Sequence, residues 1–450
     1  MKEGVLQTQS KINWLVAIGL GLFLGVLSAF SPGALFSFSL ALLIVFLINL
    51  LRDKEEKLFL TRVFIWGVSI RFFLLLLVQY FFMSQNKRLS LDGVNKCVTF
   101  FGDDGMHTIV GWWYAQYASG ANLSDYPLMV VLTGALGDYG RSGYLYLVSL
   151  FYFIFGFSPI SVTFINSIIG VLTGLIYYFI AREISGRKSA KITIILVTSF
   201  PSLIVWSIVN LKDSLFIFLT GNILWLFLLF LNKNKVRYLI MLAPLAMLQY
   251  TLRPWILLPT LFIFSLCYLL IKKRIKMAQI FLLTVILVIG SLIFKESLNE
   301  IKGKIINYHL GIVASGGFTY HIYDNWVYSG NIQTASVPCL EVIKGFFKGW
   351  LHFFFEPFPW KISSKLSLVS MPQMLIWYFL IPFSIVGILM QLRRNWKKSL
   401  VLVVYFVVIG SILSVTGGNI GTDFRIRDVL TPIVLLFSSI GLIRLLSSVD

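Results

Sequence analysis

Two adjacent carboxylates and a histidine stand out in a chain that otherwise carries few charges. They lie in the stretch FGDDGMHTIVGWWYAQYA, which covers residues 101–118. The spacing predicts a helix that begins at the acids, ends before Gly120 and places Asp103 or Asp104 on the same face as His107. One aspartate at a helix start would cap exposed N–H groups and suit the helix dipole. Capping does not account for a second aspartate beside the histidine, so we expect one carboxylate to act as a general base that deprotonates a hydroxyl.

The same helix face suggests two further candidates and one alternative chemistry. Tyr114 continues the stripe that begins at the acids, which makes Tyr114 and His107 candidate substrate-binding residues. Paired carboxylates can also bind a divalent cation, but two adjacent acids with one histidine make a weak metal signal. We therefore predict no metal ligands and leave a divalent cation open as a cofactor.

The composition indicates a membrane protein. The chain has 450 residues, of which 58% are hydrophobic and 13% charged, and its mean hydropathy is +0.85. Soluble domains carry about 25% charged residues. Apolar runs of about 20 residues recur along the sequence, and each can cross the hydrocarbon layer as a helix. We therefore predict an all-α polytopic membrane protein, a bundle of about 12 transmembrane helices with two long outer loops that contain interfacial helices.

Apolar runs and basic loops together predict the order of the spans. The expected spans lie near residues 14–31, 33–51, 63–83, 160–181, 190–208, 213–231, 238–252, 254–271, 278–294, 372–390, 399–415 and 428–447. The first is too long for a signal-peptide core, which favours a retained span. Residues 143–156 are too few to span and are expected to form an interfacial or re-entrant helix. The aromatic residues of the stretch 345–360 suit the headgroup layer.

The net charge of +19 is distributed in a way that excludes nucleic acid as the partner. Basic residues cluster in short loops between apolar runs, which is typical of cytoplasmic loops that touch anionic lipid. This pattern predicts a multi-pass protein of the plasma (inner) membrane with both termini in the cytoplasm. Most of the acidic residues then fall on the outer face, in two long segments at 84–159 and 295–371.

These segments divide one transmembrane domain of residues 1–450. The first outer loop comes after the N-terminal spans of residues 1–83. The central spans cover 160–294, and the C-terminal spans cover 372–450.

The three cysteines form no metal pattern. Cys97 and Cys339 both fall in outer segments, where a disulfide and two free thiols are equally compatible with the sequence. Cys267 is expected in the core.

Cationic side chains near the outer ends of spans are candidates for binding a phosphate. Lys212 and Asp213 begin one span, where capping and snorkelling are the alternative roles. Arg253 precedes Pro254 at another span, where membrane anchoring is the alternative role. The strongest candidates are the arginines of GGNIGTDFRIRDVLTP (417–432), Arg425 and Arg427, because basic residues on the outer face run against the positive-inside bias.

The acidic stretch resembles the first outer loop of the GT-C glycosyltransferases, particularly bacterial family-39-like members related to protein O-mannosyltransferases and lipid A aminoarabinose transferases. Asp103 and Asp104 stand where that family has an Asp-Glu pair, and His107 replaces the usual tyrosine. YAQYASG (114–120), GYLYLVSLFYFIFG (143–156) and the span that ends in REISG (182–186) are similar to the later part of that loop and the next span in the family. The family's double proline before the loop helix is missing, and two extra spans precede the usual first one.

The resemblance implies a sugar donor carried on a polyprenyl phosphate and an inverting displacement in which Asp103 is the base, with Asp104 second. The acceptor would be a hydroxyl of a protein, a glycan or a lipid at the outer face. Lys212, Arg253, Arg425 or Arg427 would stabilise the departing phosphate.

Two alternatives remain. A lipid-linked-sugar flippase or transporter would concentrate charges at the midplane of the membrane. The one clear mid-span charge is Arg71, for which a structural role is expected. A surface-polysaccharide polymerase or ligase would carry a similar loop and similar arginines.

Overall fold

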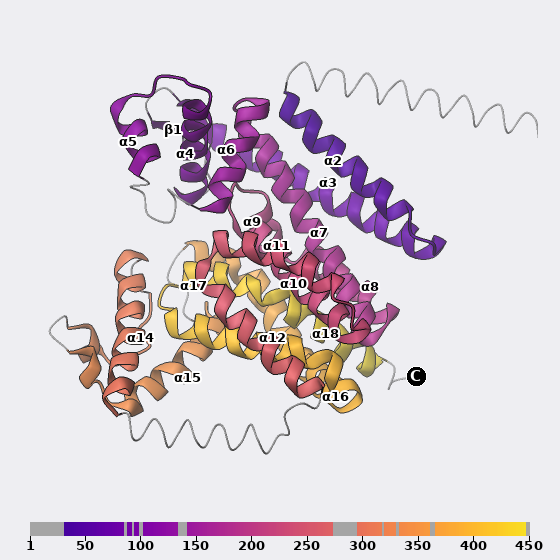
Figure 1. The fold of residues 1–450 in the computed structure, drawn as a ribbon, viewed down its shortest axis with the longest axis vertical. Coiled ribbons are helices and arrows are strands. Elements are labelled where there is room, and N and C mark those ends of the chain that lie inside the picture. Colours follow the sequence, from indigo (N-terminus) through magenta and orange to yellow (C-terminus); the bar gives the residue numbers. More distant parts are fainter. Residues whose placement is uncertain are drawn as a thin grey trace, which may run out of the picture. The chain divides into compact units, whose positions relative to one another are not determined.

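The computed structural model describes residues 31–84, 88–91, 94–98, 102–133, 142–272, 295–316, 319–329, 333–360 and 365–446 (Figure 1). The expected spans at 14–31 and 278–294, and the cysteine side chain of position 97, lie outside these residues. The contacts of the chain separate into two compact units. Unit 1 comprises residues 1–172 and 204–215, and unit 2 comprises residues 173–203 and 216–450. Each unit is described by itself below.

Unit 1 is built from helices and one small hairpin. Its elements are α2 (Pro32–Asn49), α3 (Lys54–Ser84), β1 (Arg88–Leu91), β2 (Val94–Val98), α4 (Gly102–Ala118), α5 (Asp125–Thr133), α6 (Gly143–Phe155), the first part of α7 (Pro159–Ser185), the end of α9 (Pro201–Ser207) and the start of α10 (Asp213–Lys233). Helices α2 and α3 form a helical hairpin (Figure 1). The antiparallel pair β1–β2 pairs Arg88 with Val98, and it is a small departure from the expected all-α fold.

Unit 2 holds the remaining helices. They are α8 (Arg187–Ser199), α11 (Arg237–Leu252), η2 (Pro254–Ile256), α12 (Leu257–Ile271), α14 (Lys295–Gly316), η3 (Asn325–Tyr328), η4 (Thr334–Ser336), α15 (Cys339–Phe355), α16 (Lys365–Thr416), α17 (Ile420–Ile426), η5 (Arg427–Val429) and α18 (Thr431–Leu446). Helices α16 and α18 pack closely, because a Cβ atom on Gly387 or Gly441 would overlap a backbone carbonyl of the other helix.

The prediction of a polytopic membrane protein is confirmed. Among the described residues, 6 helices are long and apolar enough to cross a membrane, or up to 8 if two bent pairs each count as one span. All ten expected spans within the described residues lie on helices, although α11 has only 16 residues and α16 joins two expected spans across non-helical backbone at Asn395. Helix α6, with 13 residues, is too short to span, as expected.

The bent pairs have local causes. Helices α8 and α9 meet at 55° where Phe200 adopts an extended conformation before Pro201, since a proline disfavours helical backbone at the preceding residue. The segment of η5 and α17 meets α18 at 62°. Two serines cap the starts of other helices. Ser31 accepts a hydrogen bond from the Ala34 N–H at the start of α2, and Ser142 accepts one from the Leu145 N–H at the start of α6.

The core of unit 1 holds helix α4 in place. Ile109, Val110 and Trp113 of α4 pack in one buried cluster with residues of α5 and α6. Gly111 allows α4 to approach α6, because a Cβ atom there would lie 2.8 Å from a methyl group of Val148. Because this apolar face of α4 is buried, the acidic first turn of the helix is held in a fixed position.

Candidate functional site

The aspartate pair occupies the first turn of helix α4. Gly102 begins the helix, and both Asp103 and Asp104 lie where the helix dipole favours negative charge. The two side chains differ in exposure: Asp103 is half-buried, whereas Asp104 is 6% exposed. The predicted helix therefore forms, and it presents its two carboxylates in different environments.

His107 belongs to the same turn. Its Nδ1 lies 2.8 Å from the backbone carbonyl oxygen of Asp103. Because a carbonyl only accepts hydrogen bonds, Nδ1 carries the proton and Nε2 is the acceptor in the neutral ring. The imidazole also meets the Tyr144 ring edge to face at 5.3 Å. His107 is fully buried and helps to hold the first turn of α4, and its contact with a substrate stays a prediction.

A series of hydrogen bonds connects four polar side chains to the backbone of Asp104. Asn166 donates from Nδ2 to the Tyr144 hydroxyl (2.7 Å), which donates to Oδ1 of Asn210 (2.6 Å). Asn210 donates from Nδ2 to the Thr108 hydroxyl (2.7 Å), and Thr108 donates to the carbonyl oxygen of Asp104 (2.8 Å). All four side chains are buried, which strengthens each bond. We call Asn166, Tyr144, Asn210 and Thr108 the polar relay.

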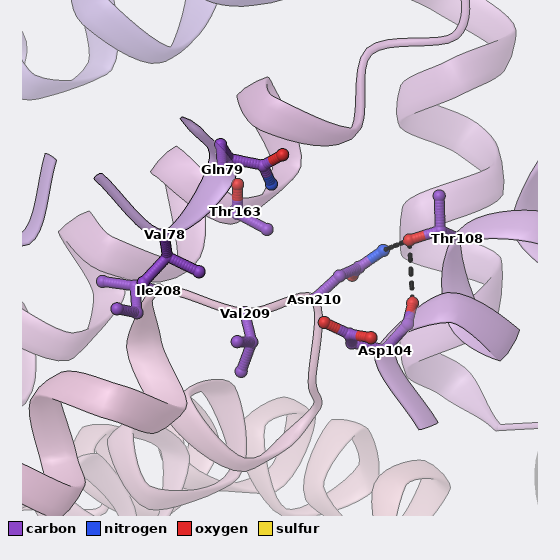
Figure 2. Close-up of a pocket in the computed structure, with 8 residues that line it drawn as sticks. All are labelled: Val78, Gln79, Asp104, Thr108, Thr163, Ile208, Val209 and Asn210. Carbon is purple, nitrogen blue, oxygen red and sulfur yellow. Dashed lines mark hydrogen bonds between the residues drawn. The ribbon is translucent and has the colours of Figure 1, made fainter. Parts of the chain in front are cut away.

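The relay borders a small pocket. Figure 2 shows the Asp104 side chain directed toward the backbone of Val209 and Asn210. The pocket is lined by Val78, Gln79, Asp104, Thr108, Thr163, Ile208, Val209 and Asn210. These residues come from α3, α4, α7 and the non-helical stretch between α9 and α10, so four segments of unit 1 meet at one carboxylate.

The electrostatics around Tyr144 keep its hydroxyl protonated. Burial raises the pKa of Tyr144, and the negative charges of Asp213 and Asp104 raise this pKa further, against a lowering by the hydrogen bond from Asn166. A protonated hydroxyl can donate to Asn210, as the relay requires.

Lys212 and Asp213 lie in unit 1 with the aspartate pair. Asp213 is the first residue of α10 and is 3% exposed, a position where a carboxylate suits the helix dipole. Lys212 precedes it and is half-buried. The structure thus brings Asp104, His107 and Asp213 into one polar region, with Lys212 adjacent in sequence.

Two other residues of unit 1 have packing roles. Tyr114 packs against the buried cluster of α4 and meets the Tyr146 ring edge to face at 5.6 Å. Arg71 is fully buried and donates from Nε to the Ser207 hydroxyl at 2.9 Å, which supplies the partner that the sequence did not reveal. Gly170 leaves room for this pair, since a Cβ atom there would lie 2.7 Å from Cβ of Ser207.

In unit 2, Arg427 is buried and held by backbone. Its Nη1 donates to the carbonyl oxygens of Phe354 and Glu356, both at 3.0 Å, and its guanidinium lies 5.2 Å from the centre of the Trp377 ring. These bonds from Nη1 stabilise the end of α15. Contact of Arg427 with a phosphate stays a prediction.

The other two candidate cations of unit 2 are more open. Arg253 directly follows α11 and lies half-buried with its guanidinium 5.0 Å from the centre of the Phe216 ring. Arg425 is half-buried in the last turn of α17. That these arginines lie near the aspartate pair stays a prediction.

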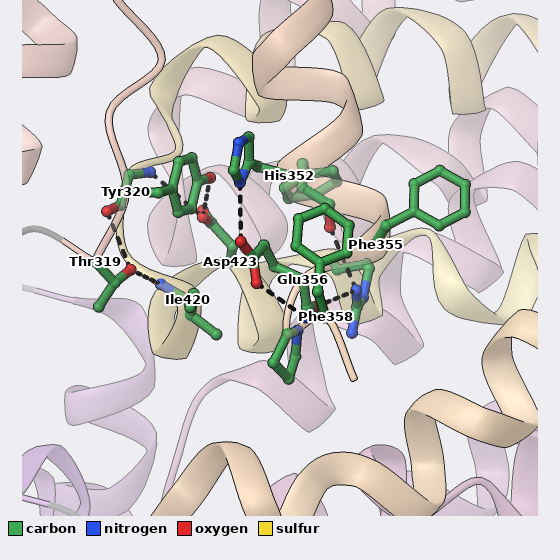
Figure 3. Close-up of polar contacts among 12 residues, drawn as sticks. Thr319, Tyr320, His352, Phe355, Glu356, Phe358, Ile420 and Asp423 are labelled. Atoms are coloured by element: carbon green, nitrogen blue, oxygen red, sulfur yellow. Dashed lines mark hydrogen bonds and ion pairs between the residues drawn. The ribbon is translucent and has the colours of Figure 1, made fainter. Parts of the chain in front are cut away.

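A second polar network in unit 2 was not expected from the sequence. The Tyr320 hydroxyl donates to Asp423, and the Tyr320 ring stacks on His352 with centroids 4.2 Å apart (Figure 3). His352 Nδ1 lies 3.0 Å from Oε1 of Glu356, whose other oxygen accepts from the Phe358 N–H. We call Tyr320, His352, Glu356 and Asp423 the closed network.

Sequence reasoning missed the relay because its members are uncharged. The available signal was the presence of Asn166 and Asn210 within apolar stretches, where an amide needs hydrogen-bond partners. Among the described residues, His, Cys, Asp and Glu side chains form no group of three or more that could hold a metal ion.

Comparison with known proteins identifies the class of the central segment. No curated protein matches the chain. Residues 143–294 match the family model described as dolichyl-phosphate-mannose-protein mannosyltransferase. The match covers the relay residues Tyr144, Asn166 and Asn210 and begins after the aspartate pair, and it confirms the resemblance drawn from the sequence. Residues 143–294 of this multi-pass membrane protein are therefore similar to the dolichyl-phosphate-mannose-protein mannosyltransferases, which are glycosyltransferases of the GT-C type.

Proposed function

We propose that the protein transfers a sugar from a polyprenyl-phosphate donor to an acceptor hydroxyl at the outer face of the membrane. The acceptor oxygen attacks the anomeric carbon, the bond from that carbon to the phosphate oxygen breaks, and the configuration inverts. The acceptor proton passes to a carboxylate of the enzyme, and polyprenyl phosphate leaves with the electron pair of the broken bond. The acceptor is a hydroxyl of a protein, a glycan or a lipid.

The observation that carries this proposal is the fixed first turn of α4. The relay holds the Asp104 carbonyl, and His107 holds the Asp103 carbonyl, so the backbone of both acids is tied down. Such rigid support suits a general base, because proton transfer depends on hydrogen-bond geometry. We assign Asp103, the more exposed acid, as the base. We assign Asp104, which lines the pocket, to orient the bound sugar or acceptor.

Cations are needed where the phosphate departs, since negative charge builds there in the transition state. Lys212 is our candidate in unit 1, and Arg253 and Arg425 are our candidates in unit 2, since all three are half-buried. Arg427 does not enter the proposal because its guanidinium is engaged by carbonyl groups.

One assay tests the reaction. Purified protein in detergent receives a radiolabelled polyprenyl-phosphate sugar and a mixed extract of acceptors, and release of polyprenyl phosphate is measured. We expect Asp103→Asn to lower the rate by about 100- to 10,000-fold, the range typical of a lost general base. We expect Asp104→Asn to be less severe and to raise KM. Asp125→Asn, at an exposed acid in the first turn of α5, is the matched control and should retain full activity.

The outcomes separate the alternatives. If Asp104→Asn abolishes release while Asp103→Asn is active, the two roles are exchanged. If neither substitution affects release, sugar transfer by this pair is wrong. Movement of labelled donor between leaflets of a vesicle without release of polyprenyl phosphate would instead favour a flippase.

A further inference from the structure

Helix α15 has two faces of opposite character. Its inner face is buried and includes Gly345 and Gly349. A Cβ atom on Gly345 would overlap the Tyr323 ring, and one on Gly349 would overlap the carbonyl of Ser414, so this face lies directly on its neighbours. Glycines four residues apart let the helix approach this closely.

The outer face of α15 carries a row of apolar side chains. Leu340 is 63% exposed, Ile343 53%, Phe347 66% and Leu351 51%. Their spacing of three, four and four residues places them in one line along the helix. We call this line the α15 ridge. Nothing in the described part of unit 2 covers it, and a continuous apolar row of this kind marks an interaction surface.

Contacts with α16 determine where α15 lies along a predicted membrane span. Gly349 contacts Ser414, two residues before α16 ends at Thr416. Trp350 packs on Phe406 with ring centroids 6.0 Å apart and lies against Gly410. Since Phe406 lies about 15 Å along the helix from Thr416, these contacts extend from the middle of the expected span 399–415 to the end of α16.

The other end of α15 is tied to the opposite half of α16. Trp377 donates from Nε1 to the carbonyl of Phe354 at 2.8 Å, and the Tyr378 hydroxyl donates to the carbonyl of Phe355 at 2.6 Å. Trp377 and Tyr378 lie in the apolar helix that begins at Ser370. Helix α15 therefore contacts both apolar halves of α16.

Charges beside the ridge indicate what it meets. Lys344 and Lys348 are exposed and lie on the same flank of the ridge. Nζ of Lys344 lies 3.8 Å from Oε2 of Glu341, so part of the charge of Lys344 is balanced. Glu341 is buried and also accepts a hydrogen bond from the Asp324 N–H. An apolar row flanked by lysines matches a lipid surface, where acyl chains take the apolar side chains and phosphates take the ammonium groups.

The aromatic residues of this segment divide between the two sides. Phe353 and Phe354 are buried, and Trp350 packs on α16, which differs from the expectation that the aromatics of 345–360 face the headgroup layer. Trp360, which comes after α15, is 81% exposed and remains available to the interface. The contact with lipid is thus made mainly by aliphatic side chains that sequence patterning did not single out.

We propose that α15 lies in the headgroup layer of the bilayer with the α15 ridge in the acyl-chain boundary and Lys344 and Lys348 on the phosphates of anionic phospholipids. This proposal does not depend on the proposed function. It would hold the second outer segment flat on the membrane.

Quenching of a probe tests this contact in the full chain. The three cysteines are replaced by serine, a single cysteine is introduced as Phe347→Cys, and an environment-sensitive fluorophore is attached. The protein is placed in nanodiscs of phosphatidylcholine and phosphatidylglycerol. We expect quenching by a shallow (5-doxyl) phospholipid to exceed quenching by aqueous iodide by at least about threefold, as for an interfacial helix. Ser336→Cys, at an exposed position of η4 just before α15, is the matched control and should show the reverse order.

The lysines are tested in the same background. Lys348→Gln should weaken shallow quenching by up to about fivefold in nanodiscs that contain phosphatidylglycerol, the factor that one basic residue near an anionic surface is worth. Lys348→Arg should preserve it. Phe347 is mostly exposed, so its replacement should leave the melting temperature unchanged, and Leu351→Cys provides a second probe on the ridge.

Iodide quenching of both ridge probes, equal to that of the control, would overturn the proposal. Shielding of the probes from both iodide and the doxyl lipid would also overturn it and would instead indicate a protein partner on this face. Equal quenching in nanodiscs with and without phosphatidylglycerol would disprove the role of the lysines.

Discussion

The polar relay of unit 1 and the closed network of unit 2 use similar residues in opposite ways. In the relay, uncharged amides and hydroxyls form a chain of hydrogen bonds that ends at the backbone carbonyl of Asp104. The carboxylate of Asp104 lines a pocket. In the closed network, the acids themselves accept from tyrosine and histidine, as Asp423 does from Tyr320. A charged residue that is part of the scaffold is thus distinguished from one available for chemistry by what its own side chain contacts.

The largest expected effect breaks the scaffold of unit 2. Arg427→Met removes a buried guanidinium and the hydrogen bonds that it donates to the carbonyl groups of Phe354 and Glu356. We expect the free energy of unfolding to fall by about 3–5 kcal/mol, the cost of removing one partner from a buried charged site. The fall is measured by thermal or denaturant unfolding in detergent.

Arg425→Met, in the neighbouring turn, is the control for Arg427. Its half-buried position predicts a change within about 1 kcal/mol. If Arg427→Met kept its stability and lost only activity, the guanidinium would be a phosphate ligand after all, and the contrast between the two networks would fail.

An intermediate effect is expected at the relay. Thr108→Val keeps the shape of the side chain but removes the hydroxyl that joins Asn210 to the Asp104 carbonyl. We expect kcat to fall by about tenfold, which corresponds to one hydrogen bond of about 1.4 kcal/mol. Thr108→Ser retains the hydroxyl and should keep most of the activity. Equal activity of the two variants would show that the relay does not position the acid.

The smallest effect concerns the pH dependence of unit 2. Tyr328 accepts from two backbone N–H groups and donates to Nε2 of His309 at 3.0 Å, which requires a neutral imidazole. Burial lowers the pKa of His309 to about 4. In the unfolded chain the histidine binds a proton near pH 6.5, so stability is lost as the pH falls from about 6.5 toward 4.

Between pH 7.5 and pH 5.5, this histidine should lower the free energy of unfolding by about 1 kcal/mol. The measurement is denaturant unfolding at both pH values, and the comparison is with His309→Gln, which lacks the titrating group. The loss attributed to His309 should be missing in that variant. An equal loss in both proteins would assign it to other groups.

Much of the fold could be predicted from the sequence because lipid imposes strong rules. Apolar runs predicted the helices, and the acidic start of α4 was predicted from Asp103 and Asp104. The interior position of Arg427 could not be predicted, since it depends on contacts with the end of α15, which is distant in sequence. The relay was equally hidden: Asn166 and Asn210 are ordinary amides until the fold brings them together.

Because the backbone between α9 and α10 is not helical, Asn166 makes two kinds of hydrogen bond. Its amide covers the carbonyls of Val209 and Leu211, which lie in non-helical backbone, and it is also the first donor of the relay. A substitution of Asn166 would leave two backbone carbonyls without this donor inside an apolar environment. The same substitution would remove the support of the first turn of α4. An inactive Asn166 variant could therefore have lost the fold of unit 1 and not only the support of the acids. Variants of Thr108 test the support of the acids more directly.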